Sequence, residues 1–209
     1  LAQIEGKSSH WLLEQALRGL CCMEHRGGCG GDSDSGDGAG LLCGIPWDFL
    51  SDIWPDIKSN HDCYGLGMLF MPKDNFRREE AKHFCEEESK KLGLVSIGWR
   101  DVPVNESTLG ELARETAPFI VQWLLKEEQS IPKDELESIL FRLRRRIGKC
   151  ARESWQDKSN DLYIVSLSSR TVVYKGMVRS SVLPRFYKDL QDPNFKISFG
   201  VYHRRFSTN

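Results

Sequence analysis

Residues 22–40 have the sequence CMEHRGGCGGDSDSGDGAG, and half of the residues from 27 to 40 are glycine. Glycine is used where the backbone needs a positive φ or where another group must approach it closely. We therefore expect at least one of Gly36, Gly38 and Gly40 to have a positive φ or to pack against another backbone. The segment predicts either a tight structural loop or a loop that lines a substrate site, with Arg26 at its entry.

Three other interpretations of this segment fit the sequence less well. A phosphate-binding loop lacks its Gly-Lys-Ser/Thr motif, and residues 36–40 lead into an apolar, strand-like segment instead of the helix that follows a dinucleotide fingerprint. A calcium loop would need glycine and glutamate where this chain has Asp37 and Cys43. A closed zinc site needs four ligands. Cys22, His25 and Cys29 are three candidates, but no second Cys/His pair follows them at a standard spacing.

The composition of the 209 residues is that of an ordinary globular protein, with 40% hydrophobic and 28% charged residues. A formal net charge of −1 offers no general attraction to nucleic acid or to an anionic membrane. No apolar run is long enough to cross a bilayer, and the first residues show no signal-peptide pattern. The seven cysteines form no C-x-x-C pair, which favours a reducing compartment over a disulfide framework. We expect no nucleic-acid partner and no membrane.

Hydrophobic periodicity predicts helices and strands that alternate along one domain. A helix capped by Ser8 or Ser9 is expected to end at Arg26-Gly27, and a longer helix has Pro132 in its first turn. Each helix places five apolar residues on one side, which predicts burial of that side. These residues are Leu12, Leu13, Ala16, Leu17 and Leu20 in the first helix, and Leu136, Ile139, Leu140, Leu143 and Ile147 in the second.

The remaining segments add further strands and shorter helices. Strands are expected at residues 64–71, 94–102, 119–126, 162–178 and 196–203, and helices at 47–54, 76–92, 107–117 and 181–190. The segment 162–178 is interrupted by Ser168-Ser169-Arg170, which predicts a hairpin of two strands. Mixed helices and hairpins indicate an α+β layered domain.

Two groups of arginines have a possible binding role. Residues 142–146 (RLRRR) lie on the long predicted helix, where the leucine faces the core and the arginines form a solvated face. Arg204 and Arg205 follow an apolar strand, and a guanidinium group at a strand end can bind a carboxylate bidentately, with the Thr208 hydroxyl beside it. From composition alone, the favoured interpretation of Arg204 and Arg205 is exposed arginines near a terminus, without a binding role.

Four separated motifs together resemble the class II glutamine amidotransferase domain of glutamate synthases. The first motif is more similar to that of the ferredoxin-dependent enzymes than to that of the NADPH-dependent ones. The motifs are Glu24-His25-Arg26-Gly27-Gly28 with Ser35-Gly36-Asp37-Gly38-Ala39-Gly40, then residues 98–105 (GWRDVPVN), then Val173-Tyr174-Lys175-Gly176-Met177, and then residues 203–209 (HRRFSTN).

The resemblance implies a fold and a reaction. The fold is an N-terminal-nucleophile hydrolase, a four-layer αββα sandwich of the α+β class, of which residues 1–209 would be a partial domain, incomplete at both ends. The reaction is hydrolysis of glutamine to glutamate and ammonia for glutamate biosynthesis. Because the nucleophilic cysteine is expected upstream of Leu1, no catalytic residue is assigned in this chain, and the chain alone is expected to be inactive.

The resemblance also implies substrate-binding residues. Arg26 would border the nucleophile, and Arg205 would pair with the α-carboxylate of glutamine. Phe206 and Thr208 would line the same pocket. Arg204, one residue earlier on an extended segment, is expected to point the other way and to tolerate alanine with little kinetic effect.

The cofactors and partners that the resemblance implies belong mostly to a longer protein. No metal and no cofactor is expected in this chain, whereas FMN and an iron-sulfur cluster are expected in the full-length enzyme. The expected partners are glutamine, downstream synthase domains of the same chain and ferredoxin, and the expected location is the cytoplasm or the plastid stroma. The alternatives are another class II amidotransferase or a non-catalytic glutamine-binding module that lacks the nucleophile.

Overall fold

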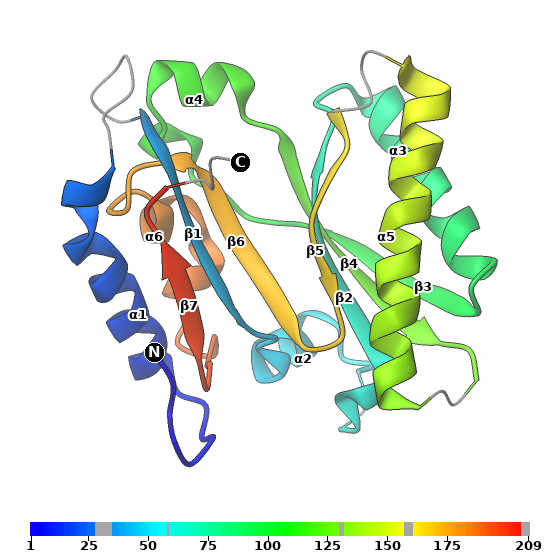
Figure 1. Cartoon of the computed structure of the whole chain (residues 1–209), viewed down its shortest axis with the longest axis horizontal. Helices are drawn as coiled ribbons and strands as arrows, with labels where there is room; N and C mark the ends of the chain where they lie inside the picture. Colours follow the sequence, from blue (N-terminus) through cyan, green and yellow to red (C-terminus); the bar gives the residue numbers. More distant parts are fainter. Residues whose placement is uncertain (28–34, 58, 130–131, 157–160, 206–209) are drawn as a thin grey trace. The chain divides into compact units, whose positions relative to one another are not determined.

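The computed structural model describes residues 1–27, 35–57, 59–129, 132–156 and 161–205, and it divides the chain into two compact units (Figure 1). The first unit comprises Leu1–Ile57, Val102–Ala117 and Val173–Asn209, and the second comprises Lys58–Asp101 and Pro118–Val172. Each unit contains one antiparallel sheet with its own helices. The chain therefore has the α+β class that the sequence predicted.

The first unit is built on a three-stranded sheet in the order β6 (Thr171–Val178), β1 (Ser35–Gly44) and β7 (Gly200–His203). Helix α1 (His10–Cys22) packs against β7, and its five predicted apolar residues are all buried. Ser9 caps the helix, since its hydroxyl accepts a hydrogen bond of 3.2 Å from the Leu12 amide. The helix ends at Cys22, four residues before the predicted end, and a separate 3-10 turn follows.

Short helical elements complete the first unit. They are η1 (Glu24–Arg26), α2 (Trp47–Ile53), η3 (Glu106–Thr108), α4 (Glu111–Thr116), α6 (Leu183–Phe186) and η5 (Lys188–Gln191). Aromatic side chains pack this unit: the Tyr174 ring lies edge-on to Tyr187 and Phe195 at 5.0 and 5.6 Å between centroids. Tyr174 also donates a hydrogen bond of 2.9 Å to the buried Asp189 carboxylate, so the core of the unit contains a satisfied polar pair.

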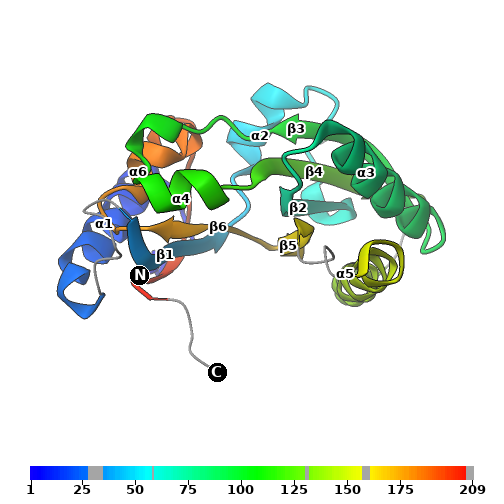
Figure 2. The same ribbon diagram turned by 90° about the horizontal axis from the view of Figure 1, so that it is seen from above.

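The second unit has a four-stranded sheet in the order β3-β4-β2-β5, with helices α3 and α5 on one side of it (Figure 2). The five predicted apolar residues of α5 are all buried against this sheet. In the sheet, Trp99 and Trp123 pair across strands with parallel rings, 4.8 Å between centroids. The elements are η2 (His61–Cys63), β2 (Tyr64–Met71), α3 (Asn75–Lys90), β3 (Leu94–Asp101), β4 (Phe119–Glu127), α5 (Lys133–Trp155) and β5 (Tyr163–Ser168).

The predicted hairpin over residues 162–178 is wrong in its pairing. The turn is present, because the Ser168 hydroxyl accepts hydrogen bonds of 3.0 and 3.1 Å from the Arg170 and Thr171 amides. The two strands nevertheless belong to different sheets: β5 pairs with β2, and β6 lies beside β1. A local turn signal identifies where the chain bends, but it does not fix the partner of each strand.

The glycine-rich segment has the close contacts that the sequence predicted. Gly38 has a φ of +113°. A Cβ atom on Gly40 would overlap the His203 ring, and one on Gly36 would lie 3.1 Å from the Arg179 amide nitrogen. The glycines of β1 are thus required by backbone conformation or by neighbours. Residues 28–34 of the segment lie outside the described residues.

None of the described helices has the length and apolar character needed to cross a membrane.

We expect Gly38→Ala to lower the free energy of unfolding by on the order of 1 kcal/mol or more, because alanine is strained at a positive φ. Urea denaturation measures this change. Gly176→Ala in β6 is the matched control, since its Cβ would meet only Val178 side-chain atoms at 3.7 Å or beyond. An equal loss of stability in both variants would contradict the role of Gly38.

Candidate functional site

The candidate site lies at one end of the three-stranded sheet in the first unit. Strands β1 and β7 are antiparallel with Gly40 opposite His203, so the start of β1 lies beside the end of β7. Strand β6 also ends here, because Gly36 in β1 lies against Val178 and Arg179. Most residues singled out from the sequence are on these segments or on η1.

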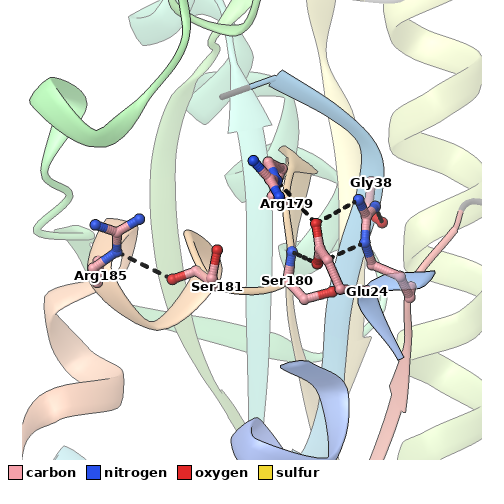
Figure 3. A network of polar contacts seen from close by, with 7 residues as sticks. Glu24, Gly38, Arg179, Ser180, Ser181 and Arg185 are labelled. Atoms are coloured by element: carbon pink, nitrogen blue, oxygen red, sulfur yellow. Dashed lines mark hydrogen bonds and ion pairs between the residues drawn. The ribbon is translucent and has the colours of Figure 1, made fainter. Parts of the chain in front are cut away.

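The centre of this end of the sheet is the carboxylate of Glu24, on η1 (Figure 3). Its Oε1 accepts hydrogen bonds from Arg179 Nε at 2.9 Å and from Arg204 Nη2 at 3.1 Å. Its Oε2 accepts from Arg204 Nε and from the Ser180 amide, both at 3.1 Å. Arg204 thus binds the carboxylate bidentately, the geometry in which guanidinium and carboxylate interact most strongly. Glu24 therefore links η1 to the ends of β6 and β7.

These contacts determine the ionisation of Glu24. Partial burial alone would raise the pKa of Glu24, but hydrogen bonds from Arg179, Arg204 and Ser180, together with the Arg204 charge, lower it to about 2. The carboxylate is therefore ionised at neutral pH, in a cluster of one negative and two positive charges. The cluster retains a net positive charge, which favours anionic groups nearby.

Arg204 has contacts that the sequence analysis did not include. Its side chain is 2% exposed, and besides Glu24 its Nη1 donates to the Gly38 carbonyl at 3.2 Å. A Cβ atom on Gly27 would overlap the Arg204 guanidinium, which explains the glycine after His25-Arg26. These contacts do not test the expected small kinetic effect of Arg204→Ala, but they predict a loss of stability, because the variant removes the bidentate partner of the Glu24 carboxylate.

Arg205 has the opposite environment to Arg204. Its side chain is 64% exposed, and its Nε lies 3.9 Å from Asp37 Oδ2, a loose contact on the protein surface. Arg26 is also exposed, on the same turn as Glu24. Since Glu24 binds the residue before Arg205, the structure brings the turn of Arg26 and the strand end of Arg205 to one place. Phe206 and Thr208 lie outside the described residues.

His203, Cys21 and Cys43 are further titratable residues of the first unit. Burial and the nearby charge of Lys175 lower the pKa of His203, so its imidazole is neutral at pH 7. Burial and the charge of Glu24 raise the pKa of the Cys21 thiol, and burial raises that of Cys43 to about 12. Reactive cysteines have lowered values. Neither of these two thiols has the lowered pKa of an activated nucleophile.

The zinc interpretation receives no support from the residues that are described. His25 Nδ1 lies 3.1 Å from the Cys22 carbonyl oxygen, a contact within the turn itself, and Cys29 lies outside the described residues. In the described part of the chain, no three His, Cys, Asp or Glu side chains are grouped so that they could hold a metal ion.

Sequence reasoning missed the roles of Glu24, Arg179 and Ser180. Ser180 is fully buried, and its hydroxyl has no hydrogen-bond partner among the described residues, so its contribution to the cluster is its backbone amide. A backbone contact leaves no signal in a sequence. Glu24 could have been suspected, because an acidic residue beside a glycine-rich loop must find a cation if it is partly buried.

Comparisons with known proteins agree with this architecture. A family model described as "Glutamine amidotransferases class-II" matches residues 1–209. Ferredoxin-dependent glutamate synthase 1, chloroplastic/mitochondrial, of Arabidopsis thaliana is 44% identical over 214 residues, which cover 100% of this chain and 13% of the relative. Ferredoxin-dependent glutamate synthase 2 of Synechocystis sp. is 45% identical over 213 residues, with the same coverage. The chain thus spans 13% of the length of these relatives.

We expect Glu24→Gln to lower the free energy of unfolding by about 1–3 kcal/mol at pH 7. The folded-state pKa of Glu24 is about 2, below the ordinary value of 4.5, so its contribution is complete above about pH 5 and is lost as the pH falls towards 2. Urea denaturation of both proteins between pH 2 and pH 7 should therefore give stabilities that converge in acid.

The control is Glu5→Gln, which removes the exposed ion pair of Glu5 with Lys7, 3.1 Å apart, and should change stability little. A constant difference between wild type and Glu24→Gln at every pH would contradict the assignment of the acid-sensitive stability to Glu24.

Proposed function

Because the chain belongs to the class II glutamine amidotransferases, we propose that it is the glutamine-hydrolysing part of a ferredoxin-dependent glutamate synthase. It is homologous to that domain of these enzymes along its whole length, at 44–45% identity to two of them. The relatives' names support glutamate synthesis with ferredoxin as the electron donor. The substrate of this chain would be glutamine, and the products glutamate and ammonia.

The observation that carries the proposal is the contrast between Arg204 and Arg205. The buried Arg204 binds Glu24 and thereby fixes the backbone at the end of β7. The side chain of the next residue, Arg205, is exposed to solvent on this fixed backbone. We propose that the Arg205 guanidinium binds the α-carboxylate of glutamine through two parallel hydrogen bonds. The net positive charge of the Glu24 cluster adds to the attraction for that carboxylate.

The other residues of the proposed site follow from the family resemblance. Arg26 would border the reacting amide, and Phe206 and Thr208 would line the pocket beside Arg205. The nucleophile would be a cysteine outside these 209 residues, whose thiolate attacks the amide carbon and releases ammonia. Water would then hydrolyse the glutamyl thioester to glutamate.

FMN and an iron-sulfur cluster would be held by other parts of the full-length protein. An iron-sulfur cluster needs four cysteine thiolates close together, and the described cysteines of this chain provide no such group. Downstream synthase domains would use the ammonia. Since the relatives include chloroplastic enzymes and a cyanobacterial one, the proposed location is the plastid stroma or the cytoplasm.

In the complete enzyme, we expect Arg205→Ala to reduce kcat/KM for glutamine, because the substrate carboxylate loses its partner. The reduction should correspond to a loss of roughly 2–5 kcal/mol of transition-state stabilisation. Most of the loss should appear in KM, and Arg205→Lys should recover part of it, since lysine keeps the charge without the planar fork. Steady-state glutaminase kinetics measure both variants.

The neighbouring variant Arg204→Ala should instead lower the melting temperature, because it removes the bidentate partner of the Glu24 carboxylate. Kinetics in which Arg205→Ala equals the wild type would refute the proposed carboxylate contact.

We expect the 209-residue chain by itself to release no ammonia from glutamine, because the resemblance places the nucleophile outside it. Triad-type removals cost many powers of ten in rate. An ammonia assay on the purified chain, with a boiled sample as the control, tests this expectation. Ammonia release above that control would mean that a cysteine within the chain is the nucleophile.

A further inference from the structure

A second cluster of arginines lies in the other unit, between helix α5 and the edge strand β5. The two elements lie side by side in both ribbon views (Figures 1 and 2) and contact each other. Between them is a cavity of about 320 Å³, to which Arg144, Arg145 and Arg152 of the helix contribute. Its size is that of a site for a small organic molecule.

These three arginines differ from their neighbour Arg146. Arg146 Nε donates to the buried Glu88 carboxylate at 2.5 Å, so the charge of Arg146 is already neutralised by an ion pair within the fold. By contrast, Arg144, Arg145 and Arg152 form no ion pair or side-chain hydrogen bond with the residues that the structure describes. Three guanidinium groups thus border one cavity without an acidic partner among those residues, although arginine side chains in close proximity repel one another.

The helix provides room for the cavity at Gly148. This glycine lies in the interior of a 23-residue helix, where glycine is less favourable than alanine. Packing does not require it, because a Cβ atom there would meet only Arg152 Nη1, at an ordinary contact distance of 3.5 Å. Gly148 does line the cavity, one helical turn from both Arg144 and Arg152. A side chain at this position would project into the space between the arginines.

The remaining walls of the cavity are largely apolar. Ile147 of the helix and Ile164 of β5 are buried, and the partly exposed Tyr163 ring lies at the margin. A ligand that fits this cavity therefore has an anionic part for the arginines and a compact apolar or ring-shaped part for the floor. The planar fork of arginine matches the oxygens of phosphate and carboxylate groups.

We propose that this cavity binds a small organic anion with at least two negative charges on phosphate or carboxylate oxygens. Arg144, Arg145 and Arg152 hold its anionic part, and Gly148 leaves the space that it occupies. This site is in a different unit from the proposed glutamine site and is independent of that function. The proposed site uses part of the helix face that the sequence predicted to be solvated.

The test is a titration of the protein with two probes, ADP and citrate, followed by isothermal calorimetry or by NMR shifts of α5 and β5. We expect saturable binding of at least one probe, with a dissociation constant that rises at least tenfold in Arg144→Ala and in Arg152→Ala. Tighter binding of ADP identifies phosphate as the recognised group, and tighter binding of citrate identifies carboxylate.

Two further variants make the test specific. Arg142→Ala removes the same charge from an exposed position on α5 that does not line the cavity, so it should leave the affinity unchanged. Gly148→Leu fills the cavity with a residue that favours helix, so it should abolish binding without lowering the melting temperature. The proposal is overturned if neither probe binds saturably, or if Arg142→Ala weakens binding as much as Arg144→Ala does.

Discussion

The bidentate ion pair between Glu24 and Arg204 fixes the functional end of the first unit. Its partners are 180 residues apart in the sequence, and Arg179 binds the same carboxylate from 155 residues away. One carboxylate therefore holds the turn after α1, the residue after β6 and the residue after β7. Closing such long loops costs entropy, and a charge-assisted, mostly buried contact at the end of the sheet offsets that cost. The geometry of Arg26 and Arg205 depends on it.

The glycines near this ion pair are explained by side chains that approach their backbone closely. Gly27 leaves space for the Arg204 guanidinium, and Gly40 leaves space for the His203 ring. Gly38 provides both a positive φ and the carbonyl that accepts from Arg204. The glycine-rich segment is thus shaped in part by the side chains of His203 in β7 and of Arg204 just after it, more than 160 residues downstream. Its composition indicated close contacts, but the groups that make them could only be identified in three dimensions.

Sequence patterns predicted local helices and strands well, but they predicted poorly which strands pair and which charged side chains meet. The apolar stripes of α1 and α5 and the strand at residues 64–71 were found because helix and strand periodicities are properties of a short segment. The hairpin at residues 162–178 was wrong because β5 pairs with β2, about 100 residues upstream. Arg204 and Arg205 show the same limit, since alternation predicts that neighbours face opposite ways but not which of them meets a carboxylate.

Ion pairing with a carboxylate distinguishes the structural arginines of this chain from those available to a ligand. In the first unit, the buried Arg204 is paired with Glu24, whereas the Arg205 side chain is 64% exposed and lies 3.9 Å from the Asp37 carboxylate. In the second unit, Arg146 is bound to the buried Glu88, whereas Arg144 lies beside a cavity without an acidic partner among the described residues. A guanidinium that is already neutralised contributes stability, and one that is held in position but not neutralised can bind an anion. Adjacent arginines of one motif therefore have different functions because their neighbours differ.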